Sequence, residues 1–207
     1  MQDWELFEAW RNGDEPAGEA LVGRYLDILT RFFRNKVNDP HDAAELISET
    51  FMACTQNKGN VRDPEAFRSF LFAAALNILR GHYRKKVKRR RELDDFADIC
   101  VGDAEHPRSL GSLAALQEET RLLVRALRRI SMDQQIVLEL EYFEGMSATT
   151  IADLLGVSRK TVYTRVSRGK ERLRAVMLEL SRSPELVEST MIGIQTWAMK
   201  IREGLER

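Results

Sequence analysis

The sequence predicts an all-α protein that has two small helical domains, a flexible linker between them and a C-terminal amphipathic helix. Three observations support this prediction. Apolar residues recur every three to four positions nearly throughout the chain. Segments with the strict apolar–polar alternation of a strand are scarce, and glycine and proline fall between the helical segments. We place the domains at residues 1–91 and 112–180, the linker at 92–111 and the terminal extension at 181–207.

The first domain is predicted to contain four helices. A short amphipathic helix over Trp4–Trp10 precedes a longer one over Ala17–Val37, and Asn38-Asp39-Pro40 ends the latter. A third helix runs from about Asp42 to Asn57. Asp63-Pro64-Glu65 then starts a fourth, because it combines a cap, a first-turn proline and an acid favoured by the helix dipole. The apolar stripe of the fourth helix comprises Phe67, Phe70, Leu71, Ala74 and Ile78.

The far end of this fourth helix is strongly basic. Eight basic residues and no acid lie between Arg80 and Arg91, which is more than the helix dipole alone would favour. A second basic cluster spans Arg159–Arg174, although the formal net charge of the chain is zero. Two separate basic patches on a neutral chain predict two contacts with a polyanion.

The second domain is predicted to contain four helices, and its last two form a helix-turn-helix. The first two helices span Ser112–Arg129 and about Met132–Glu144. Ser147 can cap the third, Gly156 suits the left-handed residue that ends it, and Ser158 can cap the fourth. Val162, Val166 and Leu173 should face inward, which leaves a row of basic, hydroxyl and aromatic side chains facing outward. Such a row suits the major groove of DNA, although a solvated basic face on an ordinary helical hairpin has the same pattern.

Two segments lie outside the predicted domains. Residues 92–111 are acidic, contain glycine and proline and show weak periodicity, which is typical of a linker. Ser183-Pro184-Glu185 starts a further helix whose apolar residues form one seam. That seam needs a partner, which is either the chain's own domains, another protein or a second copy. The seam comprises Val187, Met191, Ile194, Ala198, Ile201 and Leu205.

Other classes of function have little support in the sequence. No apolar run approaches the ~20 residues of a membrane span, and the acidic, aromatic N-terminus is not a signal peptide. Cys54 and Cys100 lack the spacing of paired ligands, which predicts reduced thiols in a cytoplasmic protein. The three histidines, His41, His82 and His106, show no ligand spacing either and are expected at the surface. We expect no metal, no cofactor and no catalytic activity.

Taken together and in order, these segments resemble the extracytoplasmic-function (ECF) sigma factors of the sigma-70 family, the small promoter-specificity subunits of bacterial RNA polymerase. The resemblance covers about residues 4–177. The segments that carry it are RNGDEPAGEALVGRY near the N-terminus, DAAELISETF (Asp42–Phe51), FRSFLFAAALNILRGHYRKK (Phe67–Lys86) and the helix-turn-helix (Met146–Arg174). It implies two domains, called regions 2 and 4, that bind core polymerase and the minus-ten and minus-thirty-five promoter elements.

The resemblance also assigns roles to individual residues. Contacts with the minus-thirty-five element are expected from Arg159, Lys160, Thr161, Tyr163, Thr164, Arg165 and Arg168. Contacts with the minus-ten element are expected from Asn57, Lys58, Asn60, Arg62, Asn77, Arg80, Tyr83, Arg84 and Lys85. Docking to core polymerase is expected from Asp42, Glu45, Leu46, Glu49 and Thr50. The implied partners are promoter DNA, the clamp helices of the polymerase β′ subunit, the β flap, and an anti-sigma factor or other regulator.

Two alternatives stay open at this point. A stand-alone helix-turn-helix regulator would explain the C-terminal half, with the last helix used for dimerisation, but not the basic helix end of the first domain. A metal-dependent enzyme could use the carboxylates around Asp42, Glu45 and Glu49, but no nucleophile–base pair or cofactor loop accompanies them.

Overall fold

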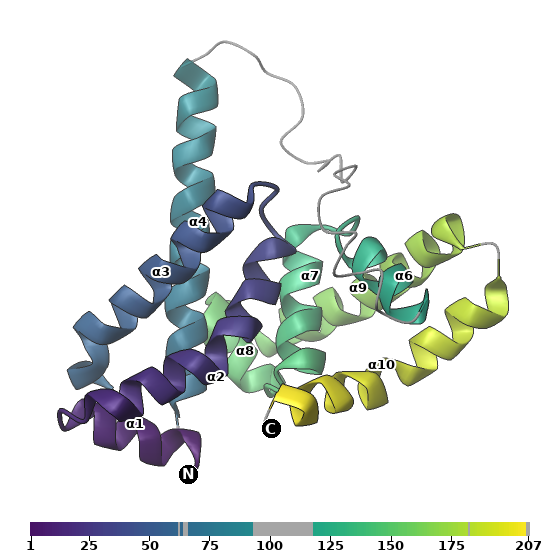
Figure 1. The fold of residues 1–207 in the computed structure, drawn as a ribbon. Coiled ribbons are helices and arrows are strands. Elements are labelled where there is room, and N and C mark those ends of the chain that lie inside the picture. The colour runs from purple at the N-terminus through teal and green to yellow at the C-terminus, as the bar shows by residue number, and fades with distance from the viewer. Residues whose placement is uncertain (62, 64–65, 93–117, 182, 206–207) are drawn as a thin grey trace. The chain divides into compact units, whose positions relative to one another are not determined.

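The computed structural model describes residues 1–61, 63, 66–92, 118–181 and 183–205, with the backbone alone at 87–92, 118–120 and 195–205. All regular structure in these ranges is helical, which confirms the predicted all-α class (Figure 1). The chain divides into two compact units, Met1–Ala97 and Asp98–Arg207. The predicted linker lies almost entirely outside the described residues.

The described part of the first unit is a bundle of four α-helices, in which α2 lies beside α1 and α3, and α4 lies along α3 (Figure 1). A single turn of 3-10 helix, η1, follows α3. The elements are α1 (Asp3–Arg11), α2 (Glu15–Arg34), α3 (Pro40–Asn57), η1 (Lys58–Asn60) and α4 (Phe67–Glu92).

Local capping sets where these helices begin. Asp14 accepts a hydrogen bond from the backbone N–H of Ala17 at the start of α2, and Pro16 occupies its first turn. Asp39 caps α3 through the N–H of His41 and Pro40 is its first residue, so this helix begins two residues before the predicted Asp42. The Asp39-Pro40 pair that ends the preceding helix also starts α3, because aspartate can cap a helix and proline suits its first turn.

Aromatic side chains dominate the core of the first unit. Phe7 of α1 stacks on Phe67 of α4 with ring centroids 4.9 Å apart, and Tyr25 of α2 meets Phe67 edge to face at 5.4 Å. Phe72 is fully buried and packs edge to face on Phe32, although the predicted stripe of α4 omitted it. The buried face of α4 is therefore rotated from the prediction, and Phe70 is only half-buried.

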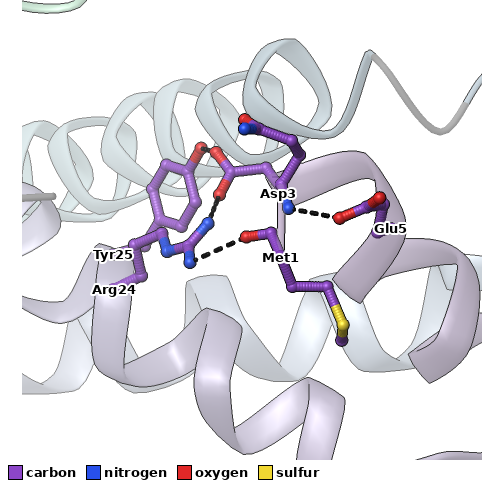
Figure 2. A network of polar contacts seen from close by, with 6 residues as sticks. Met1, Asp3, Glu5, Arg24 and Tyr25 are labelled. Atoms are coloured by element: carbon purple, nitrogen blue, oxygen red, sulfur yellow. Dashed lines mark hydrogen bonds and ion pairs between the residues drawn. The ribbon is translucent and has the colours of Figure 1, made fainter.

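A polar network ties α1 to α2 (Figure 2). The carboxylate of Asp3 lies between Arg24, whose guanidinium donates to it, and Tyr25, whose hydroxyl does the same. Arg24 also donates to the backbone carbonyl of Met1 at 3.2 Å. Glu5 accepts from the backbone N–H of Gln2, which closes a capping box on α1. The buried ring of Tyr25 thus keeps a partner for its hydroxyl.

The described residues of the second unit form five α-helices and a π-helical turn, η4. Residue 144 donates its backbone N–H to Glu139, five positions back, and Gly145 has a φ of 65° that ends the turn. The predicted single helix Met132–Glu144 is therefore α-helical only in its first half. The elements are α6 (Glu118–Leu127), α7 (Met132–Leu138), η4 (Glu139–Phe143), α8 (Ala148–Leu155), α9 (Arg159–Leu180) and α10 (Pro184–Leu205).

The last helix, α10, packs on α6, η4 and α9 of its own unit. Val187 is fully buried and Ile194 is 3% exposed, whereas Ile192 is 80% exposed on the other side of the helix. Glu188 accepts two hydrogen bonds from the guanidinium of Arg174 in α9. The first half of the apolar seam therefore packs on the chain's own domain, which is one of the three partners considered for it. The residues Ala198, Ile201 and Leu205 lie where the backbone alone is described.

Candidate nucleic-acid interface

The helix-turn-helix is built as the sequence predicts. Ser147 accepts a hydrogen bond from the N–H of Thr150 at the start of α8, and Ser158 accepts one from Thr161 at the start of α9, each at 3.1 Å. Gly156 adopts the left-handed conformation between the helices, with φ 67° and ψ 37°. These local interactions fix where α9 begins.

The inward face of α9 packs on α7 and α8. Val162 and Leu173 are almost completely buried, and Val166 is 9% exposed, as predicted. Gly169 lies on the same face, where an added Cβ would be 3.2 Å from Leu138 Cδ1 of α7. The absence of a side chain at Gly169 therefore lets α7 and α9 approach closely, which fixes the side of α9 that faces solvent.

The outward face of α9 presents most of the residues expected to contact the minus-thirty-five element. Tyr163 is 61% exposed, and the hydroxyl of Thr164 donates to the carbonyl of Lys160 one turn earlier. Thr161 is half-buried because it takes part in the cap. Arg165 is also half-buried, and it forms an ion pair with Asp133 of α7 that the sequence did not reveal. The exposed members are Arg159, Lys160, Tyr163, Thr164 and Arg168.

In the first unit, one face of α4 carries exposed polar residues at helical spacing. Asn77 accepts a hydrogen bond from Arg80 at 3.4 Å, and Arg84 donates to the carbonyl of Arg80 at 3.4 Å. These three residues and Lys85 are exposed, as contact with a nucleic acid requires. The basic residues from 88 onward lie where the backbone alone is described.

Tyr83, which the resemblance places among the minus-ten contacts, is partly used inside the protein. Its hydroxyl donates to the backbone carbonyl of Lys36, two residues beyond the end of α2, and its ring meets His82 edge to face. Burial, and secondarily the charge of Asp42, raises the pKa of the Tyr83 phenol. Tyr83 therefore joins α4 to α2, and only part of its ring faces solvent.

The loop after α3 divides into exposed and bound residues. Asn57 and Asn60 are exposed, and the amide of Asn57 donates to the carbonyl of Ala53 at 2.8 Å. Lys58 contacts α1 within the unit. Its ammonium donates to the backbone carbonyl of Trp10 at 2.9 Å and lies 4.8 Å from the centroid of the Trp10 ring. These two contacts keep the ammonium of Lys58 against Trp10 of α1. Arg62 lies outside the described residues.

The residues expected to dock core polymerase do not all reach the surface. Glu45 is exposed, and Asp42 and Glu49 are half-buried. Leu46 is 3% exposed and Thr50 is fully buried, with its hydroxyl donating to the carbonyl of Leu46. Leu46 and Thr50 lie on the side of α3 that packs in the bundle, so their side chains are not at the surface that a docked partner would meet.

One histidine occupies a position that the sequence did not suggest. The Nε2 of His82 lies 3.6 Å from the carboxylate of Asp42 and is shielded from solvent, so His82 is not a simple surface residue. His41 is exposed as expected, and His106 lies outside the described residues. Within the described ranges, no group of three or more histidine, cysteine or acidic residues could hold a metal ion. Every helix in the described ranges is too short or too polar to span a lipid bilayer.

Comparison with known proteins identifies both units. A sigma-70 region 2 model matches residues 21–89, and a sigma-70 region 4 model matches residues 120–173. The RNA polymerase sigma-H factor of Pseudomonas aeruginosa is 28% identical over 194 residues, which cover 87% of this chain and 96% of the relative. The ECF RNA polymerase sigma factor SigW of Bacillus subtilis is 23% identical over 82% of this chain and 94% of its own length. The chain belongs to the ECF sigma factors of the sigma-70 family.

Solved structures with the same fold include other sigma factors. CnrH, solved in complex with the cytosolic domain of CnrY, has a TM-score of 0.62 and 24% identity over 86% of this sigma factor and 99% of that chain. RpoE of Bartonella quintana, solved with the anti-sigma factor NepR, has a TM-score of 0.62 and 22% identity over 79% of this chain and 96% of its own. As a sigma factor, the protein gives bacterial RNA polymerase its promoter specificity.

Proposed function

We propose that this sigma factor contacts a promoter at two places while it is bound to core RNA polymerase. In this proposal α9 recognises the minus-thirty-five duplex, α4 and the η1 loop hold the opened minus-ten strand, and the acidic side of α3 docks the polymerase. The observation that carries the proposal is the two-sided character of α9, which buries one apolar face and presents basic and hydroxyl groups on the other.

Recognition of the minus-thirty-five element would follow from the chemistry of the exposed face of α9. Arginine can donate two hydrogen bonds to a guanine edge, and lysine and hydroxyl groups can hold phosphates. Tyr163 adds an exposed aromatic group that suits the methyl group of thymine. Arg159, Lys160 and Thr161 occupy the first turn of α9, and the N-terminal turns of a recognition helix lie nearest the base edges. Thr164, Arg165 and Arg168 continue the row.

The minus-ten role rests on a different chemistry. An unpaired base exposes its whole edge and its π-face, so short amides and basic side chains can hold a melted strand. Asn77, Arg80 and Arg84 supply such groups from α4, and Asn57 and Asn60 supply them from the end of α3 and from η1. Lys85 extends the charged face. We assign Lys58 and Tyr83 to supporting roles because their polar atoms have partners inside the unit.

Docking to core polymerase would use the carboxylates of α3. Asp42, Glu45 and Glu49 lie at spacings of three and four residues, which brings them to neighbouring positions on the helix. They suit the basic surface of a partner helix such as the β′ clamp helices, while Leu46 and Thr50 hold α3 in the bundle. The second unit would meet the β flap, and a linker at residues 92–111 would join domains 1–91 and 112–180.

Two consequences complete the proposal. The sigma factor supplies no bond-breaking chemistry, which belongs to the polymerase, and it acts in the cytoplasm where the bacterial polymerase works. CnrH was solved with the cytosolic domain of CnrY, and RpoE of Bartonella quintana was solved with the anti-sigma factor NepR. We therefore propose an anti-sigma factor as a further partner of this chain.

The decisive experiment is transcription with purified core polymerase. We expect the full-length chain to start RNA synthesis at specific sites on a library of bacterial promoter DNA, and core polymerase alone should not. A stand-alone helix-turn-helix regulator would bind DNA but would start no transcript. Arg159→Ala should reduce transcription from promoters that depend on the upstream element. Arg172→Ala is the matched control and should not reduce it, because Arg172 lies two-thirds along the same helix and its side chain is 52% exposed.

A test of polymerase docking complements this assay. Glu45→Lys together with Glu49→Lys should weaken capture of core polymerase, because two of the three charges on the acidic side of α3 are reversed. Glu19→Lys is a suitable control, since Glu19 is an exposed acid on α2. Equal capture by all three proteins would contradict the docking role of α3. Arg165→Ala should leave capture unchanged, and an equal loss of capture and of upstream promoter use would show that Arg165 is structural.

A further inference from the structure

Asp133 of α7 and Arg165 of α9 form an ion pair that joins the recognition helix to the helix behind it. The Nη2 atom of Arg165 lies 2.8 Å from the Oδ2 atom of Asp133. The side chain of Arg165 is 28% exposed, and that of Asp133 is 63% exposed. Neither residue lies in the core, and Arg165 is more enclosed than the other basic residues on the first turns of α9, which are exposed.

The two helices hold the carboxylate in a fixed place relative to α9. Gly169 lies one turn beyond Arg165, and an added Cβ there would be 3.3 Å from Gln134 Cβ and 3.2 Å from Leu138 Cδ1 of α7. The buried Val162 and Val166 flank Arg165 on the packed side of α9. Asp133 is next to Gln134 in the sequence, so its backbone is set by this contact. The close packing of α7 on α9 therefore keeps the carboxylate of Asp133 beside Arg165.

A role in stability alone explains little. Ion pairs between solvent-exposed groups contribute almost nothing to folding, because water and salt screen them. What the pair does change is the freedom of a long side chain. A guanidinium has five N–H donors in a planar fork, and the contact with Asp133 occupies one terminal nitrogen. The remaining edge can meet a guanine, and holding it in one orientation reduces the entropy lost when DNA binds.

We propose that Asp133 is a positioning residue for promoter recognition, which holds Arg165 in the orientation that distinguishes one base pair of the upstream element. This inference rests on the proposed function of α9. The opposite possibility is that Asp133 masks Arg165 in the free protein. The two roles predict different effects of removing Asp133. Loss of a mask would raise the affinity for every DNA sequence, whereas loss of a positioning group would lower the discrimination between sequences.

The test uses the full-length chain, core polymerase and a promoter library randomised over the upstream element, with sequencing of the transcribed templates. The wild-type chain should enrich a guanine at one position. Asp133→Ala should reduce that preference by about fivefold, the lower end of what a bidentate arginine–guanine contact provides. Preferences at the other positions should stay, and Asp133→Glu should restore part of the lost preference. Asp153→Ala, which removes an exposed acid of α8, should leave the whole pattern unchanged.

A double substitution shows whether Asp133 acts through Arg165. In an Arg165→Ala background, Asp133→Ala should cause no further loss of preference. Asp133→Asn keeps the shape of the side chain but removes its charge. It should reduce the guanine preference as Asp133→Ala does, because the charge of Asp133 positions the arginine.

Three results would overturn the inference, and they are distinguishable. If the wild-type chain enriches an upstream sequence and Asp133→Ala enriches the same one, Asp133 has no positioning role while the proposed function stands. If Asp133→Ala raises transcription from all templates equally, Asp133 is a mask. A wild-type chain that enriches no upstream sequence would remove the proposed function of α9 and this inference with it.

Discussion

Two isoleucines two residues apart on α10 give a direct test of whether the C-terminal helix belongs to the second unit. Ile194 is 3% exposed and Ile192 is 80% exposed. Both residues lie inside the same helix, so replacement by alanine changes intrinsic helix propensity by the same small amount at each site. Any difference between Ile194→Ala and Ile192→Ala must then come from packing.

The structure sets the size of the expected difference. Replacing a buried isoleucine by alanine typically costs ~2–5 kcal/mol, because apolar contacts are lost and a cavity remains. A surface substitution usually stays within ~0.5 kcal/mol. Even the lower limit, ~2 kcal/mol, corresponds to an approximately 30-fold rise in the population of the opened state at 25 °C, since a tenfold change requires about 1.4 kcal/mol.

Amide hydrogen exchange followed by mass spectrometry measures this population segment by segment. We expect Ile194→Ala to speed exchange in α10 and in the helices that it contacts, and Ile192→Ala to leave exchange unchanged. Peptides from Met1–Ala97 serve as an internal control, since that unit has its own core. Equal exchange in the two variants would refute the packing of α10 on its own unit. It would return the apolar seam to the alternatives of another protein or a second copy.

Three further predictions test other parts of the structure. Gly156→Ala should destabilise the second unit by ~1–2 kcal/mol, because φ at Gly156 is +67°. Gly193→Ala should stabilise the same unit, because Gly193 lies in the middle of α10 and an added Cβ meets nothing within 4 Å. Thermal unfolding of the two variants tests both expectations. Tyr83→Phe should lower the stability of the first unit by ~1 kcal/mol, since the carbonyl of Lys36 loses a donor; unchanged urea unfolding would contradict this role. Burial raises the pKa of Cys54 from 9.0 to about 12. Alkylation of this thiol at pH 8 should therefore be slow until urea unfolds the protein. The folding stability that depends on the neutral thiol should be complete below pH 9 and lost as the pH rises toward 12.

The local start and stop signals of the chain were sufficient for most of the helix boundaries. Ser147, Gly156 and Ser158 each act through hydrogen bonds or backbone angles within a few residues, so their effect could be predicted without a tertiary model. The π-helical turn Glu139–Phe143 could not, because its pattern of apolar residues is close to that of an α-helix.

The candidate site was predicted in kind but not residue by residue. The outward basic face of α9 followed from the positions of Val162 and Val166, since a helix that buries one side exposes the other. Which polar atoms are already occupied depends on contacts between distant segments. Lys58 meets Trp10 across 48 positions, and Tyr83 meets Lys36 across 47, so no local pattern could reveal either.

The sequence by itself therefore determined the all-α class, the caps and turn of the helix-turn-helix and the family to which the motifs belong. These properties depend on neighbouring residues or on the order of short segments along the chain. Only the tertiary structure decided that Arg165 is paired with Asp133 and that α10 packs against its own unit. Each of these depends on how one helix is rotated against another, which is set by the fit of side chains across the whole core.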